Sequence, residues 1–169
     1  VYDPSTGEAI ARVPACTRAE VESAVAAAKA AYPAWRDTPP RKRCQLMFRL
    51  RELLVRDMEE LTRLCATENG KVLSEAAGDV GKALEMTELA SGALHHLMGD
   101  SLMDASKGYD TVTYREPLGV FAGIAPWNFP AMIPVGWMAP LCIVCGNTFV
   151  LKPAMTTPLT SLRIAALYK

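Results

Sequence analysis

The sequence predicts an α/β fold, in which N-terminal helices precede the first βαβ unit of a doubly wound parallel sheet. Helical periodicity fills most of residues 17–99, and two short apolar runs, 118–126 and 147–153, flank a segment of helix length. A polar stretch that alternates like an exposed strand separates the two halves. Two parallel strands cannot cover their own faces, so we expect an incomplete domain within these 169 residues.

The first hundred residues are expected to form an arm and three helices. Residues 1–16 contain an Asp-Pro-Ser-Thr-Gly turn, which is typical of a short hairpin or extended arm. Thr17 and Glu20 form a capping box at the start of the first helix, and Asn69-Gly70 stops the second. Within a helical region of 17–103, the predicted helices cover 17–33, 39–69 and 74–99.

The remaining residues are expected to form a polar hairpin and the βαβ unit. The stretch "DTVTYRE" belongs to a hairpin predicted over 104–117. The uncharged run "LGVFAGIAP" is typical of a strand buried on both faces of a parallel sheet. A buried helix over 131–145, a second buried strand in "NTFVLKP" and a helix over 158–168 complete the unit at 118–169.

Composition excludes several classes of partner. Eighteen basic residues balance eighteen acidic ones, so no nucleic-acid or anionic-membrane partner is indicated, and a small ligand is expected. Residues 117–151 lack charge over more than the roughly 20 residues of a membrane span, but their prolines argue against a spanning helix. Five cysteines, an odd number, favour reduced thiols in the cytoplasm or an organelle matrix.

Ligands of open α/β sheets bind beyond the carboxyl ends of the strands, which directs attention to "PWNFP" and to Lys152. The Asn128 amide could donate to an oxygen that gains charge during a reaction, or it could bond its own backbone in a turn. Lys152 could bind ribose hydroxyls or a phosphate, or simply extend into water. The residues alone leave both choices open.

Other chemically distinctive residues point to no metal site. Cys142 and Cys145 form a C-x-x-C in an apolar setting without a second pair, which favours core cysteines. His95 and His96 are adjacent on a helix and point about 100° apart, a poor arrangement for metal binding. The Gly-x-Gly-x-x-Gly fingerprint of dinucleotide sites is missing.

Several motifs along the whole chain, among them "YDPSTGEAIARVP", "ENGK", "REPLGVFAGIAPWNFPAMIP" and "GNTFVLKP", resemble the N-terminal part of an aldehyde dehydrogenase. Within that superfamily, "NFPAMIP" followed by "CGNTF" is most similar to the methylmalonate-semialdehyde branch, which acylates coenzyme A. The resemblance implies NAD-dependent oxidation of methylmalonate or malonate semialdehyde to propionyl-CoA or acetyl-CoA through a cysteine thiolate. It also implies a homo-oligomer, a dimer or tetramer that uses the hairpin, in the cytoplasm or a mitochondrial matrix.

The resemblance also assigns roles to individual residues. Asn128 would hydrogen-bond the thiohemiacetal oxygen, and Lys152 would bind the adenosine ribose. Met155 occupies the position where the family usually has a ribose-binding glutamate, which leaves NAD against NADP open. The further cofactor contacts implied are Ile124, Ala125, Pro126 and Trp127.

Two departures from the family pattern qualify this prediction. None of the five cysteines lies in the family's nucleophile motif, so these residues alone are expected to be inactive. One extra residue, in "PVGWMAP", separates Asn128 from Lys152, and we expect a bulge or shifted helix end to absorb it. Two alternatives remain: an aldehyde dehydrogenase for another substrate, and a non-catalytic fragment that binds nucleotide or a partner.

Overall fold

The computed structural model describes residues 1–169 and confirms the predicted α/β class. The helices are α1 (Arg18–Arg36), α2 (Pro40–Arg56), α3 (Met58–Asn69), α4 (Leu73–Ser91), α5 (Ala139–Val144) and α6 (Leu159–Ala165). The strands are β1 (Ser101–Ser106), β2 (Tyr109–Val112), β3 (Val120–Ile124) and β4 (Thr148–Lys152). A π-helix spans Met132–Met138, and short 3-10 turns span His95–Leu97 and Ala166–Tyr168. No helix is both long and apolar enough to cross a membrane.

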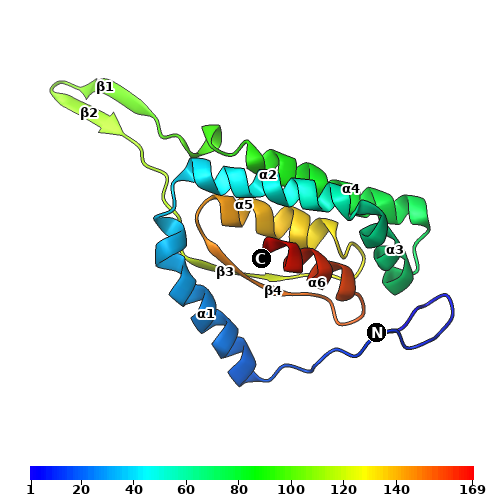
Figure 1. Cartoon of the computed structure of the whole chain (residues 1–169). Coiled ribbons are helices and arrows are strands. Elements are labelled where there is room, and N and C mark those ends of the chain that lie inside the picture. The colour runs from blue at the N-terminus through cyan, green and yellow to red at the C-terminus, as the bar shows by residue number, and fades with distance from the viewer.

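The hydrophobic core lies where α2, α3 and α4 pack against the π-helix, α5 and α6 (Figure 1). Leu50 and Leu54 project from one face of α2, because a spacing of four residues returns to the same side of a helix. Leu61, Val80 and Ile164 are fully buried and come from three further helices. Each such aliphatic side chain stabilises the fold by about 1.5–3 kcal/mol.

Strands β3 and β4 pair in parallel, and the π-helix and α5 connect them, so the predicted βαβ unit is confirmed. Figure 1 shows this pair between α1 on one side and α5 on the other. The prediction that the first strand is buried on both faces is wrong for these residues, since Phe121 is 38% and Ile124 is 75% exposed. This parallel sheet contains only β3 and β4, so each of the two strands keeps one edge that pairs with no other strand.

Helix α1 continues through Pro33, where the sequence predicted its end, as far as Arg36. Two long-range bonds hold this last part of the helix. The Tyr32 hydroxyl donates to the Pro117 carbonyl at 2.8 Å, and the Trp35 indole N–H donates to the Ile143 carbonyl at 2.8 Å. These contacts to the segments that flank β3 and β4 outweigh the helix-breaking tendency of proline.

The second predicted helix is two helices, α2 and α3, separated at Asp57. The backbone of Asp57 has φ −96° and ψ 8°, outside the helical range. Its carboxylate accepts bonds from Arg56 on α2 and from Arg163 on α6. The break is therefore fixed by a partner 106 residues away, which local periodicity does not reveal.

The third predicted helix ends at Ser91, eight residues before Gly99, and a 3-10 turn follows. The hairpin of β1 and β2 begins at Ser101, three residues before the predicted start, and every residue in both strands is exposed. It projects away from the helical layers in Figure 1. The N-terminal arm closes through a bridge between Tyr2 and Ala9, as its turn residues predicted.

The helix predicted over 131–145 forms as the π-helix followed directly by α5. A π-helix bonds residue i to i+5, so one π-turn holds one residue more than an α-turn. The π-helix overlaps the stretch "PVGWMAP", in which the sequence contains one residue more than the family pattern. That this π-helix absorbs the extra residue stays a prediction.

Candidate functional site

The two predicted loops meet at the carboxyl ends of β3 and β4. The last register pair is Ile124 with Lys152, and the Ala125 N–H then donates to the Lys152 carbonyl at 3.1 Å. The loop that carries Asn128 therefore begins beside Lys152. This edge is where ligands of doubly wound sheets bind.

The Asn128 side chain is exposed and makes no hydrogen bond to any other part of the chain. The interpretation in which this amide bonds its own backbone to form a turn therefore finds no support. Only the Asn128 backbone carbonyl is engaged, as an acceptor from the Lys71 ammonium at 2.9 Å. The amide is thus available to a bound molecule.

The backbone of this loop, in contrast, is held at every carbonyl from Trp127 to Pro130. The Trp127 carbonyl accepts two bonds of 2.9 Å, and the Asn128, Phe129 and Pro130 carbonyls accept one each. Asn69 and Thr157 donate to the Trp127 carbonyl, and Lys71 donates to the Asn128 carbonyl. The Ile133 backbone N–H donates to the Phe129 carbonyl, and the Ser161 hydroxyl donates to the Pro130 carbonyl. Most of these bonds are long-range, so the loop is anchored to α6 and the segment between α3 and α4.

A buried ion pair lies behind the loop. The Lys71 ammonium is 3.1 Å from the Asp79 carboxylate, and the two side chains are only 10% and 0% exposed. The other carboxylate oxygen of Asp79 accepts the Met132 N–H at 2.7 Å. Burial, and next the Asp79 charge, raise the pKa of the Cys65 thiol, which donates to Asp79 at 3.4 Å. Cys65 is therefore held as a neutral thiol.

Sequence reasoning missed this support. Asn69 and Lys71 lie in "ENGK", which was interpreted only as a helix stop and a family motif. Asp79 stands three residues after Ala76 and four before Ala83, so helical spacing places it with the buried residues of α4, and sequence analysis did not use this signal. A charged residue followed by an apolar helix face carries no signal for a contact more than fifty residues away.

The predicted cofactor residues form a mostly open surface at the same edge. Ile124, Trp127 and Met155 are 75%, 63% and 71% exposed, whereas Ala125 is buried at 7%. Pro126 and Lys152 are also exposed, and the Lys152 ammonium forms no ion pair or hydrogen bond in the chain. A free ammonium beside exposed backbone fits the binding of a ribose, whose hydroxyls accept hydrogen bonds.

Glu68 holds the end of the loop that connects β4 to α6. Its buried carboxylate accepts the backbone N–H groups of Leu159 at 2.7 Å and Thr160 at 2.8 Å, which begin α6. Burial raises the pKa of Glu68 above its ordinary value, and the bonds from Thr160 and Leu159 act in the opposite direction. The contact fixes the segment between Lys152 and α6, and sequence analysis did not foresee it.

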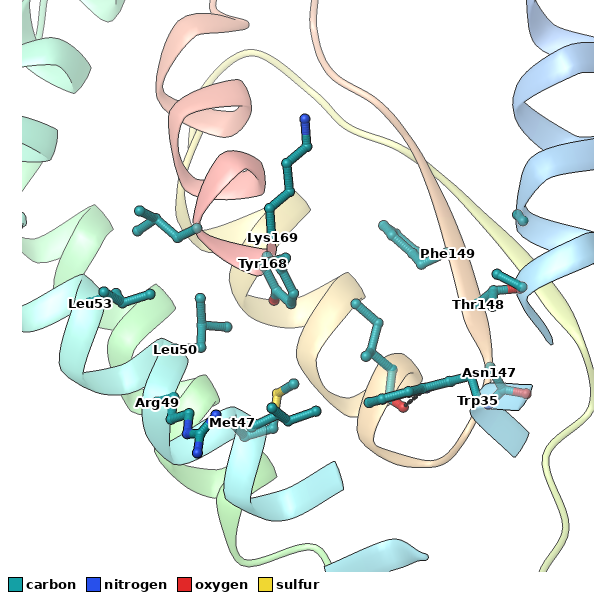
Figure 2. Close-up of a pocket in the computed structure, with 15 residues that line it drawn as sticks. Trp35, Met47, Arg49, Leu50, Leu53, Asn147, Thr148, Phe149, Tyr168 and Lys169 are labelled. Atoms are coloured by element: carbon teal, nitrogen blue, oxygen red, sulfur yellow. Dashed lines mark hydrogen bonds between the residues drawn. The ribbon is translucent and has the colours of Figure 1, made fainter. Parts of the chain in front are cut away.

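The cavities of the molecule coincide only partly with this site. A cavity of about 540 Å³ is lined by Trp127 and Met155, with Glu68 and Asn69 at its wall, but not by Asn128 or Lys152. A cavity of about 580 Å³ lies between α1, α2, β4 and the C-terminus and contains none of the predicted residues (Figure 2). Leu50 and Leu53 face Phe149 and Tyr168 across it. Because none of the predicted residues lines this cavity, the groups at the strand ends, where ligands of doubly wound sheets bind, locate the candidate site better than cavity size does.

Comparison with known proteins agrees with this geometry. The malonate-semialdehyde dehydrogenase 2 of Geobacillus thermodenitrificans (strain NG80-2) is 49% identical over 168 residues, 99% of this chain and 35% of that protein. A crystal structure of methylmalonate-semialdehyde dehydrogenase from Oceanimonas doudoroffii has a TM-score of 0.95 at 43% identity and covers 99% of this chain and 34% of its own. PnpE in complex with nicotinamide adenine dinucleotide has a TM-score of 0.93 at 34% identity, with the same coverages of 99% and 34%.

The chain spans about a third of the length of these relatives. The aldehyde dehydrogenase family itself matches residues 1–169, the whole of the sequence. The loop at the end of β3, the lysine at the end of β4 and this match lead to one conclusion. The chain belongs to the aldehyde dehydrogenase family.

Proposed function

We propose that the whole protein that carries this chain is an NAD-dependent aldehyde dehydrogenase for malonate or methylmalonate semialdehyde. Its products would be acetyl-CoA or propionyl-CoA together with CO2 and NADH, with coenzyme A as co-substrate. The observation that carries the proposal is the exposed, unbonded Asn128 amide on a loop whose carbonyls from Trp127 to Pro130 are all engaged, near the free ammonium of Lys152. The 49% identity to a malonate-semialdehyde dehydrogenase supports the choice of substrate.

The residues at the strand ends fit the cofactor. Bound NAD would accept the electron pair removed from the aldehyde. The exposed Lys152 ammonium would donate to the adenosine ribose, and Ile124, Ala125, Pro126 and Trp127 would form the adjoining surface. Met155 offers no carboxylate to receive ribose hydroxyls, so the preference for NAD over NADP has to come from other groups.

Asn128 would act on the aldehyde oxygen. When a thiolate adds to the carbonyl, that oxygen becomes negatively charged, and the Asn128 N–H group donates to it. A donor that is already aimed at this position needs no reorganisation during the reaction, and one such donor lowers the barrier by about 3 kcal/mol. The held backbone of the loop provides that preorganisation.

The hairpin of β1 and β2 is the proposed contact between copies in a dimer or tetramer. Leu102, Met103 and Tyr109 are 62%, 78% and 72% exposed, a density of apolar side chains that favours association. We also propose a cytoplasmic setting, or a mitochondrial matrix in a eukaryote, in keeping with five unpaired cysteines.

Replacement of the amide tests the proposed function. In the whole protein, Asn128→Ala should lower kcat on malonate semialdehyde about a hundredfold, while the Kd for NAD stays unchanged. Gln45→Ala, which removes an exposed amide from α2, is the matched control and should leave kcat unchanged. An unchanged kcat in Asn128→Ala would refute the role of the amide. Repeated turnover, measured as steady-state NADH formation, without added coenzyme A would refute the acyl transfer.

A further inference from the structure

We propose that Lys71, held in place by Asp79, is a positioning residue that fixes the orientation of the Asn128 peptide. This inference rests on the proposed function, because it concerns the aim of the same amide. It adds a role for two residues that touch neither the aldehyde nor the cofactor surface. It arises from the buried ion pair of Lys71 and Asp79.

The Lys71 ammonium is confined from three directions. It donates to the Asn128 carbonyl at 2.9 Å and to the Asp79 carboxylate at 3.1 Å, and it lies 4.6 Å from the centre of the Phe129 ring. Cation and ring at this distance attract each other. Since the side chain is only 10% exposed, water competes little for its hydrogen atoms.

Asp79 connects Asn128, through Lys71, with Met132 at the start of the π-helix. One carboxylate oxygen accepts from Lys71, which reaches Asn128, and the other accepts the Met132 N–H at 2.7 Å, where the π-helix begins. A single buried carboxylate on α4 thus bridges the residue with the free amide and the first residue after the loop. Any rotation of the Asn128 peptide would break a charge-assisted bond inside the protein.

This arrangement bears on the direction of the amide, because the peptide planes on either side set the Cα–Cβ bond of Asn128. Displacement of a reacting group by about 1 Å can cost about a hundredfold in rate. An apolar pair in place of Lys71 and Asp79 would avoid the cost of burying charge, but it could not donate to the Asn128 carbonyl. The ion pair therefore supplies direction rather than mere packing.

A double-mutant cycle on the whole protein tests the coupling. Lys71→Met alone should lower kcat about tenfold or more with the Kd for NAD unchanged, and in an Asn128→Ala background it should lower kcat no further. Additive losses in the two backgrounds would show a general structural role and overturn the proposal. Lys82→Met, which removes an exposed lysine paired with Glu85 on the same helix as Asp79, is the control and should keep full kcat.

A second variant guards against misfolding. Lys71→Met leaves the Asp79 carboxylate buried without its cation, and the chain could unfold for that reason alone. Lys71→Met/Asp79→Asn removes both charges and keeps an oxygen for the Met132 N–H. If the proposal holds, this double variant is folded and still loses kcat about tenfold or more, whereas recovery of full kcat refutes it.

A readout of the contact itself separates failure of this inference from failure of the proposed function. Asn128-Phe129 is the only Asn-Phe pair in the 169 residues, so ¹³C-carbonyl asparagine with ¹⁵N-phenylalanine labels that one peptide here. Its signal, assigned by its loss in Asn128→Ala, should move upfield in Lys71→Met, since the carbonyl loses a charged donor. An unmoved signal overturns the inference. A moved signal with unaltered kcat in Asn128→Ala refutes the proposed function instead.

Discussion

Gly136 of the π-helix lies directly against Ala83 of α4, because a Cβ on Gly136 would come within 2.9 Å of the Ala83 Cα. The space is filled by backbone, which cannot rotate away. Gly136→Ala should therefore lower the free energy of unfolding by about 1–3 kcal/mol through overpacking. Urea unfolding of the two proteins measures the difference.

Gly78 is the matched control for that substitution. It lies inside α4, and a Cβ there would meet no atom within 4 Å. Gly78→Ala should raise the free energy of unfolding by up to about 1 kcal/mol, because alanine has the higher helix propensity. Equal effects of the two substitutions would show that the contact with Ala83 does not constrain the π-helix.

Glu68 makes stability depend on pH. Burial raises its pKa in the folded chain above the ordinary value of 4.5, so the folded state binds this proton more tightly than the unfolded state. The stability that Glu68 adds through this tighter proton binding is fully present below about pH 4.5 and is lost as the pH rises through the pKa of Glu68 in the folded chain. The free energy of unfolding of the native protein minus that of Glu68→Gln should fall as the pH rises above about 4.5. A rise would mean that the bonds from Leu159 and Thr160 outweigh burial.

The cysteines should differ in reactivity. Cys16 is exposed, whereas burial raises the pKa of Cys142 to about 11, which leaves about one thiolate in a thousand at about pH 8. Iodoacetamide followed by peptide mass spectrometry should modify Cys16 within minutes and leave Cys44, Cys65 and Cys142 unmodified. In urea all of them should react. Rapid native labelling of Cys65 would contradict its placement in the core.

Met155 should not itself discriminate between NAD and NADP, and a carboxylate introduced at this position should do so. It is 71% exposed at the position expected of a ribose-binding carboxylate, so no charge there repels a 2′-phosphate. In the whole protein, Met155→Glu should weaken NADP binding relative to NAD by about tenfold, since a like charge costs about 1.4 kcal/mol or more at close range. Met103→Glu, the same change on the exposed hairpin, controls for net charge and should leave the ratio of the two Kd values unchanged.

The sequence predicted those features that depend on neighbours along the chain. The capping box at Thr17 and Glu20 forms, with the Thr17 N–H donating to the Glu20 carboxylate at 2.6 Å. The stop at Asn69-Gly70 also forms, because Gly70 takes the left-handed conformation that ends α3. Two apolar runs around a helical segment predicted the βαβ unit and its loops, and that placement brought Asn128 to the strand ends.

Contacts between distant segments decided the rest. Helix α1 continues past Pro33 because the bond from Trp35 to another element outweighs the helix-breaking tendency of proline. The predicted second helix is interrupted at Asp57, where the bond from Arg163 outweighs the helical periodicity of the sequence. The burial of Lys71 and Asp79 likewise depends on the packing of α4 beneath the loop. A local pattern records which face of a helix is apolar, but it holds no information on which remote group will lie opposite a charge. Sequence by itself therefore determined where the amide lies, and only the tertiary structure decided what holds it there.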